Sequence, residues 1–320
     1  MDNTALNADV FAEWLSRQGH HIVKTASSYW YDAAPHIYQA FPYHWLITPA
    51  ERELTDLLWR TRGIALRYST LPTAAIGKVS YHAVFAGAEY DMAHLPKKAR
   101  HDVQTGLRNC TVERIPLSRM AEDGWRMRHE THVRQGRAAA ETQTAWRRLC
   151  LAADGLPGFE AWATICRGEM IASLFAFSAG DCCSILHQQS LTDSMKLCAN
   201  NALIFVFTSE VLKRGPVSQL FYGLHSLDAP ASLDAFKFRM RYTARPVRQR
   251  VVFHPLVAPL ANRGLYQVLR LVLRWRPDQP ALAKAEGVLR FYLEGQRPWD
   301  QQDLPEPVRD KPAVEATDAA

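Results

Sequence analysis

The fold of this chain is decided by the stretch Ile171-Ala-Ser-Leu-Phe-Ala-Phe177, an almost continuous apolar run of strand length. A strand with one solvated face alternates apolar and polar residues, so a continuous run predicts a strand that is covered on both faces. Strand-like runs at 159–166 and 181–190 flank it, separated by the turn signals Arg167-Gly-Glu169 and Ala179-Gly180. The three runs therefore predict an antiparallel meander with the quoted stretch as its central strand.

The residues that follow this meander predict alternating helices and strands. The run 200–214 is long enough for a buried helix, and Gly215-Pro216 ends it. A strand at 218–225, a short helix at 233–240 and a last strand at 247–253 complete the order. The chain is therefore expected to be an α/β protein.

Two motifs in this order resemble those of the Fem-type (FemAB-like) GNAT acyltransferases. The stretch Leu233-Asp-Ala-Phe-Lys237 is similar to the family's Phe-Lys signature before its last strand. Upstream, Leu95-Pro-Lys-Lys-Ala-Arg-His-Asp-Val-Gln-Thr-Gly-Leu-Arg108 and the strand-like Cys110-Thr-Val-Glu-Arg-Ile115 resemble its basic helix and following strand. The resemblance covers about Tyr90 to Pro255 and implies a GNAT-like fold, with one truncated and one full GNAT-like part.

The length and composition agree with an ordinary globular protein. A chain of 320 residues accommodates one large or two medium domains. We expect a truncated GNAT-like α/β part at 1–116, a GNAT-like domain at 117–255, a helical hairpin at 256–296 and a disordered tail at 297–320. The formal charge of +6 favours an anionic ligand or surface but is too diffuse to require nucleic acid.

Cysteine usage and the N-terminal residues indicate a cytoplasmic protein. The six cysteines lie mostly in apolar runs without a paired framework, which is typical of reduced core thiols. The N-terminus lacks a positive region followed by an apolar one, and no apolar run reaches about 18 residues. We therefore expect neither an export signal nor a spanning helix.

The segment Tyr29 to Trp45 is crowded with aromatic residues and histidines and is interrupted by Pro35 and Pro42. This pattern predicts an irregular packed loop. Its rings would either line a ligand cleft or cover the core.

Polar residues on the strands of the central module are the candidates for acid or base catalysis. The resemblance implies direct attack of an amine on an acyl ester held by a splayed strand. That reaction needs an oxyanion-stabilising N–H, a base for the amine and an acid for the leaving group. The catalytic candidates are Tyr222 and His225, near the carboxyl end of their strand, and His187, which would otherwise be a structural histidine in an apolar strand.

Cationic and amide side chains are the candidates for substrate binding. Lys237 falls in the family-like signature and would pair with a phosphate or carboxylate, or else lie on a helix surface. Lys97 and Arg100 lie on the basic face of the helix that begins near Leu95, which would receive a phosphate or simply be solvated. Asn200 and Asn201 start a helix and would present amides to an anion.

The acyl donor is left open between acyl-CoA and aminoacyl-tRNA. Acetyl-CoA enzymes hold the pyrophosphate with a glycine-containing loop before a helix. Here the corresponding connection, Leu191-Thr-Asp-Ser-Met-Lys-Leu-Cys-Ala-Asn-Asn201, has no glycine. Fem-type relatives that use aminoacyl-tRNA also lack that loop, so weak CoA binding is expected and transfer activity is not excluded.

A metal site is not expected. His129 and His132 are three residues apart, which differs from the H-E-x-x-H zinc motif, and no third ligand is evident nearby.

The leucine-rich segment Leu256 to Trp275 contains Arg263, Arg270 and Arg274. It would either pack on the sheet domain or lie on an anionic membrane surface as a basic amphipathic helix. We expect packing, because apolar residues occupy many successive positions.

These features lead to one functional reading with two alternatives. The chain is expected to transfer an acyl or aminoacyl group to an amine of a cell-envelope or polysaccharide precursor, an anionic or lipid-linked substrate, in the cytoplasm or at the inner membrane surface. The resemblance alone implies that acceptor. The alternatives are an acyl-CoA-dependent N-acyltransferase of a small metabolite and a catalytically silent binding protein of the same fold.

Overall fold

A computed structural model of the protein describes residues 3–136, 141–225, 232–276 and 279–309, and it divides the chain into two compact units. Unit 1 comprises Met1–Gln18, Ala83–Gly223 and Ala231–Thr243, and unit 2 comprises Gly19–His82, Leu224–Pro230 and Ala244–Ala320. Each unit is assembled from separate segments of the chain. The boundaries between the two units therefore lie at other positions than the domain boundary expected after residue 116.

Unit 1 contains the predicted meander. Its strands are β6 (Thr111–Ile115), β7 (Phe159–Cys166), β8 (Glu169–Ala179), β9 (Cys182–Ser190) and β10 (Gln219–Leu224), in the order β10-β9-β8-β7-β6. β8 pairs antiparallel with both β7 and β9, as predicted. Its residues Met170 to Phe177 are all buried, which explains why this strand is continuously apolar.

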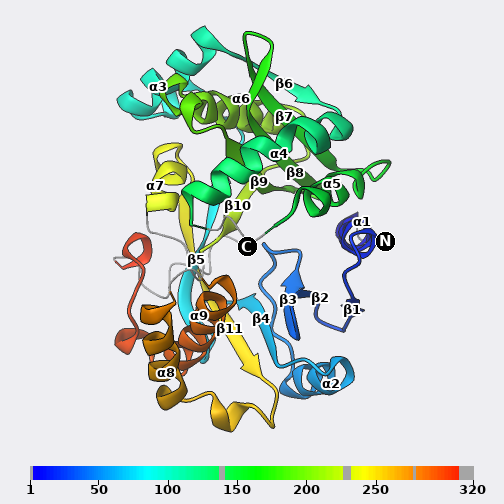
Figure 1. The fold of residues 1–320 in the computed structure, drawn as a ribbon, viewed down its shortest axis with the longest axis vertical. Helices are drawn as coiled ribbons and strands as arrows, with labels where there is room; N and C mark the ends of the chain where they lie inside the picture. Colours follow the sequence, from blue (N-terminus) through cyan, green and yellow to red (C-terminus); the bar gives the residue numbers. More distant parts are fainter. Residues whose placement is uncertain (1–2, 137–140, 226–231, 277–278, 310–320) are drawn as a thin grey trace. The chain divides into compact units, whose positions relative to one another are not determined.

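Helices cover both faces of the unit 1 sheet (Figure 1). The helices of this unit are α1 (Asn3–Arg17), α3 (Lys97–Asn109), α4 (Leu117–Arg134), α5 (Gln143–Leu151), α6 (Ala199–Lys213) and α7 (Ser232–Arg239), with short 3-10 turns η1 (Met92–His94) and η2 (Asp193–Leu197). Adjacent residues of a strand point to opposite faces. His187 of β9 contacts Arg128 of α4, whereas Gln188 contacts Asn200 of α6, so α4 and α6 lie on opposite faces.

Unit 2 is built on the strands β1 (Ile22–Lys24), β2 (Tyr29–Ala34), β3 (Ile37–Phe41), β4 (Ala65–Thr70) and β11 (Thr243–Phe253), in that order across the sheet. β5 (Lys78–Ala86) contributes Lys78–His82 to this unit. The helices are α2 (Glu51–Thr61), α8 (Arg263–Trp275) and α9 (Pro280–Gly295), with η3 (Ala258–Leu260), η4 (Trp299–Gln301) and η5 (Glu306–Val308).

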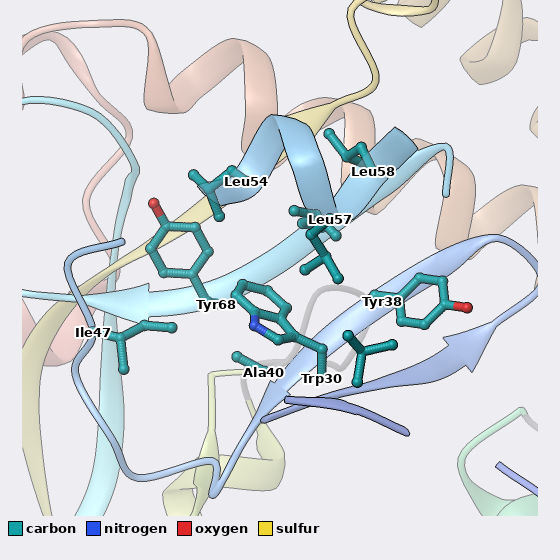
Figure 2. Close-up of a cluster of buried hydrophobic side chains, with 10 residues drawn as sticks. Trp30, Tyr38, Ala40, Ile47, Leu54, Leu57, Leu58 and Tyr68 are labelled. Carbon is teal, nitrogen blue, oxygen red and sulfur yellow. The ribbon is translucent and has the colours of Figure 1, made fainter. Parts of the chain in front are cut away.

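The segment expected to be an irregular loop, 29–45, instead contains the hairpin of β2 and β3. Its aromatic residues drive this outcome, because Trp30, Tyr38 and Phe41 are buried strand residues. Figure 2 shows Trp30 among the leucines of α2 and beside Tyr68 of β4. The two prolines lie outside the strands, in the turn after β2 and directly after β3. The rings therefore form part of the core.

The C-terminal residues correct two expectations. The predicted disordered tail begins too early, since Gln302 bonds to the backbone of Gly77 and Val79, and Val308 is fully buried. Residues 310–320 of that tail lie outside the described residues. The segment expected to be a helical hairpin contains the two helices α8 and α9, and residues 277–278 between them lie outside the described residues.

α9 and α8 differ sharply in burial. α9 places Val288 and Phe291 in a core cluster with Ala65 and Val251. None of the α8 residues is fully buried, but Tyr266, Leu269 and Leu273 are partly buried, so the segment packs less deeply than its apolar content predicted. Within the described ranges, no helix combines the length and apolarity needed to cross a bilayer.

Candidate functional site

The central feature of the candidate site is the short pairing between β9 and β10. These strands pair in parallel at Gln219↔Cys182, Leu220↔Cys183 and Phe221↔Ser184. β9 then continues to Ser190 and β10 to Leu224, and within the described residues the two strands have no further pair. The register between β8 and β9 shifts just beyond this point, leaving Leu186 as an extra residue. Bulges of this kind re-aim a strand, often beside active sites.

Three side chains of unit 1 meet where β10 leaves β9. Lys237 of α7 forms an ion pair of 2.7 Å with Asp234, and both side chains are mostly buried, at 17% and 13% exposure. The Lys237 ammonium lies 5.1 Å from the centroid of the Tyr222 ring, a cation–π distance. Lys237 is therefore a semi-buried cation and not a helix-surface lysine.

Tyr222 can act as a proton donor in these surroundings. Its ring packs edge-on against Tyr242 at 5.0 Å, and the Tyr242 hydroxyl in turn hydrogen-bonds Thr208 at 2.7 Å. Burial, reinforced by the negative charge of Asp234, raises the pKa of Tyr222 well above 10. The phenol is therefore protonated at neutral pH, so it carries a proton that it can donate, and it cannot accept one as a base.

Gly223 lies in β10 directly after Tyr222. Its φ is +120°, a conformation that disfavours other residues, so the backbone accounts for the glycine at this position.

The two asparagines at the start of α6 are engaged within the fold. The Asn200 side chain accepts a hydrogen bond from Gln188 at 3.0 Å and donates one to Ser190 at 2.9 Å. Asn201 contacts the Met240 sulfur at 3.6 Å. Asn200 therefore ties the helix start to the part of β9 that does not pair with β10, and both its amide oxygen and its amide nitrogen have partners within the fold.

His187 belongs to a different cluster. Its ring stacks on Phe175 and meets Trp146 edge-on, and its Nδ1 accepts a hydrogen bond from Arg128 at 3.1 Å. Arg128 also donates to Glu141 at 2.7 Å. Burial lowers the pKa of His187 well below 6.5, and the Arg128 and His132 charges lower it further. His187 is a neutral residue on the α4 face of β9, opposite the face that contacts α6.

Lys97 and Arg100 are both exposed on α3. Arg100 donates to the Leu95 carbonyl at 3.1 Å. Buried Ala99, Val103 and Gly106 form the packing face of this helix, so the expected division into a packed and a basic face is correct.

His225 belongs to unit 2, although only two residues separate it from Tyr222 in the sequence. Its ring stacks on Tyr81 at 4.7 Å, and its Nδ1 lies 3.3 Å from the Ser80 hydroxyl. Gln249 donates to Ser80 at 3.1 Å and to the His225 carbonyl at 3.2 Å. The structure does not bring His225 and Tyr222 into one cluster.

Sequence reasoning missed the rest of this unit 2 cluster. Arg67 donates to the Gln249 side chain at 3.0 Å, and His82 hydrogen-bonds Ser69 at 2.9 Å. Burial lowers the pKa of His82 to about 3, and the nearby positive charges of His44, Arg245 and Arg67 act in the same direction. β5 has polar residues at every second position from Lys78 to His82. This alternation could have indicated the polar cluster, because every one of these strand positions is buried.

Other possible sites are less developed. Within the described parts of the chain, no group of three His, Cys, Asp or Glu residues is arranged to hold a metal ion. A cavity of about 510 Å³ beside η2 is lined by His129, Glu130, Val133, Arg134, Thr192 and Asp193. None of the predicted catalytic or binding residues lines it.

Comparison with known proteins identifies the fold. No family model and no curated protein sequence matches the chain. Among solved structures, FemX is similar with a TM-score of 0.52 at 10% identity, over 81% of this chain and 92% of FemX. L-PGS from Bacillus licheniformis is similar with a TM-score of 0.50 at 12% identity, over 83% of this chain and 95% of that protein. A GCN5-related N-acetyltransferase from Kribbella flavida has a TM-score of 0.44 at 11% identity, over 78% and 96% of the two chains.

The likeness to FemX and L-PGS shows that this chain shares their fold, in agreement with the GNAT-like fold expected from the sequence. The strand order, the meander and the short parallel pair of β9 and β10 agree with it.

Proposed function

We propose that the protein is a GNAT-type transferase that moves an acyl or aminoacyl group from an activated ester to an amine. The observation that carries this proposal is the separation of β9 from β10 beyond Ser184 and Phe221, with protonated Tyr222 at the point of separation. An unpaired strand edge offers N–H groups to a ligand carbonyl. The acyl donor would lie along this edge of β9.

The chemistry follows from these groups. The unprotonated amine attacks the acyl carbon, a C–N bond forms, and the C–S or C–O bond to the leaving group breaks. Backbone N–H groups of β9 near the Leu186 bulge would stabilise the oxyanion. Tyr222 would give its proton to the leaving group and regain one from the amine nitrogen, so that the phenol is unchanged after turnover.

The donor and acceptor are proposed from the surroundings of the site. The connection from Leu191 to Asn201 lacks glycine, and the Asn200 amide is used within the fold, which disfavours CoA and favours an aminoacyl ester such as aminoacyl-tRNA. Semi-buried Lys237 would pair with an anionic group of the substrate. The similarity to FemX and L-PGS supports a link to the cell envelope. We propose as acceptor an amine of a cell-envelope or polysaccharide precursor, including a lipid-linked one, at a cytoplasmic site.

The test is a transfer assay on the full chain with acyl-CoA thioesters and charged tRNA as donors and amine-bearing envelope precursors as acceptors, followed by mass spectrometry. We expect product from charged tRNA, and a loss of about 10²- to 10⁴-fold in kcat for Tyr222→Phe, the range for general acid catalysis. Tyr292→Phe in α9 is the matched control. Product only from acyl-CoA and a small metabolite amine would support the metabolite acyltransferase. Ligand binding without product from any donor would identify a binding protein.

A further inference from the structure

α8 presents an apolar surface to solvent. The exposed fractions are Leu265 42%, Val268 56%, Leu271 55%, Val272 37% and Trp275 81%. We call these five residues the α8 apolar face. Leu256 and Leu260, just before the helix, are also exposed, at 70% and 64%. Single exposed apolar residues are ordinary, but a contiguous set marks an interaction surface.

The α8 apolar face is separate from the side of the helix that packs in unit 2. Leu265, Val268, Val272 and Trp275 recur three and four residues apart, so they share one side of the helix. Tyr266, Leu269 and Leu273 are partly buried on another side, and Tyr266 hydrogen-bonds Glu286 of α9. Figure 1 shows α8 beside α9. Among the residues that the structure describes, the contacts with α9 therefore leave the α8 apolar face exposed.

The charged residues in the segment that forms this surface are all positive. Residues 256–276 contain Arg263, Arg270, Arg274 and Arg276 and no aspartate or glutamate. A second copy docked through this surface would bring two such arginine sets together, which is unfavourable. An anionic bilayer is complementary to it, because aliphatic and tryptophan side chains enter the interface while arginine side chains reach the lipid phosphates.

We propose that α8 docks the protein on the surface of an anionic phospholipid bilayer. The helix lies in the plane of the interface, with the α8 apolar face in the boundary between headgroups and acyl chains. Trp275, the most exposed of the set, is the anchor at the carboxyl end of the helix. The docking does not depend on the proposed transfer reaction.

The experiment is sedimentation of the full chain with vesicles of phosphatidylcholine alone and of phosphatidylcholine with phosphatidylglycerol. We expect at least about tenfold tighter binding to the anionic vesicles at low salt, weakening as salt screens the arginines. Val268→Ser combined with Trp275→Ser should reduce this binding at least about tenfold, since both apolar contacts are removed. Arg270→Gln with Arg274→Gln should weaken it by about fivefold per arginine.

Two matched controls separate docking from general effects. Val133→Ser changes a valine of similar exposure, 53%, in unit 1. Arg52→Gln with Arg60→Gln removes the same charge from α2. Both should bind vesicles like the wild type, and circular dichroism should show all variants folded.

Equal vesicle binding by the wild type and the Val268 and Trp275 variant would overturn the proposal, as would equal binding to neutral and anionic vesicles. Loss of a dimer in light scattering, with vesicle binding unchanged, would instead assign the face to a second copy of this chain.

Discussion

Lys237 is the residue whose interpretation differs most between the sequence and the structure. In the sequence it is a lysine in a family-like signature, and in the structure it is a mostly buried ammonium held by Asp234 and the Tyr222 ring. An ammonium in this environment can bind an anionic substrate, but it also has a structural role. The two roles are separable.

We predict that Lys237→Ala lowers kcat/KM by about tenfold or more for an anionic substrate, since a hydrogen bond to a charged group contributes about 1.5–3 kcal/mol. It should also destabilise the protein, because the mostly buried carboxylate of Asp234 is left without its cation. Steady-state kinetics and thermal melting measure the two effects.

The matched control for Lys237 is the double variant Asp234→Asn with Lys237→Ala, which removes both charges. It should recover most of the lost stability and none of the lost kcat/KM. Recovery of both would show that Lys237 acts only through Asp234.

Buried His82 makes the free energy of unfolding depend on pH. Its pKa is about 3 in the folded protein against an ordinary 6.5, so between these values the unfolded chain binds a proton that the folded protein does not. The free energy of unfolding therefore falls as the pH falls from 6.5 toward 3, by up to about 1.4 kcal/mol per pH unit from this residue.

We predict that His82→Gln reduces this pH dependence between pH 6 and 4.5, as measured by urea unfolding. The lowered pKa of His187 acts in the same direction but is present in both proteins, so the difference in slope isolates His82. Parallel stability profiles for the two proteins would show that His82 is protonated in the folded state.

At the scale of elements, the contact between α3 and α6 depends on Gly106. A Cβ at this position would lie 2.7 Å from the Ala202 Cβ and 2.7 Å from the Cys198 carbonyl oxygen. Both atoms belong to the start of α6, which is fixed to β9 through Asn200. The glycine therefore sets how closely the two helices approach.

We predict that Gly106→Ala destabilises the protein by about 1–3 kcal/mol in chemical denaturation, the cost of overpacking. Alanine alone would favour the helix by about 1 kcal/mol, so the clash decides the sign. Gln104→Ala, at an exposed position of the same helix, is the control and should be neutral or slightly stabilising. A more stable Gly106→Ala protein would contradict the close approach of α3 and α6.

At the scale of the whole molecule, the chain forms two compact units, and each contains buried apolar residues. Local opening in one unit need not expose the other. Phe291 of α9, which is 1% exposed, is a test position because it packs with Ala65 and Val251 in unit 2.

Phe291→Ala should destabilise the core of unit 2 by about 3–5 kcal/mol. We predict that it accelerates amide hydrogen exchange in β4 and β11 and leaves the exchange rate in β8 of unit 1 unchanged. Mass spectrometry of peptic fragments measures this directly. Equal acceleration in β4 and β8 would mean that the two units open as one cooperative body.

The local sequence pattern determined the meander and the fold class, although not the hairpin of β2 and β3. The apolar run at 171–177 and its flanking turns determined the meander, because burial on both faces needs continuous apolar residues. The motif around Lys237 pointed to the Fem type of GNAT-like fold. Both signals are local, since they depend on neighbouring residues and periodicity.

Only the tertiary structure decided which distant residues meet. It grouped Tyr222 with Lys237, set His187 on another face and placed His225 with Ser80 and Gln249. It also left α8 exposed where apolar content had predicted packing, because the apolar residues of α8 fall on more sides of the helix than its packing partner covers. Strand register and helix docking depend on contacts between residues far apart in the chain, and a local pattern carries no record of them.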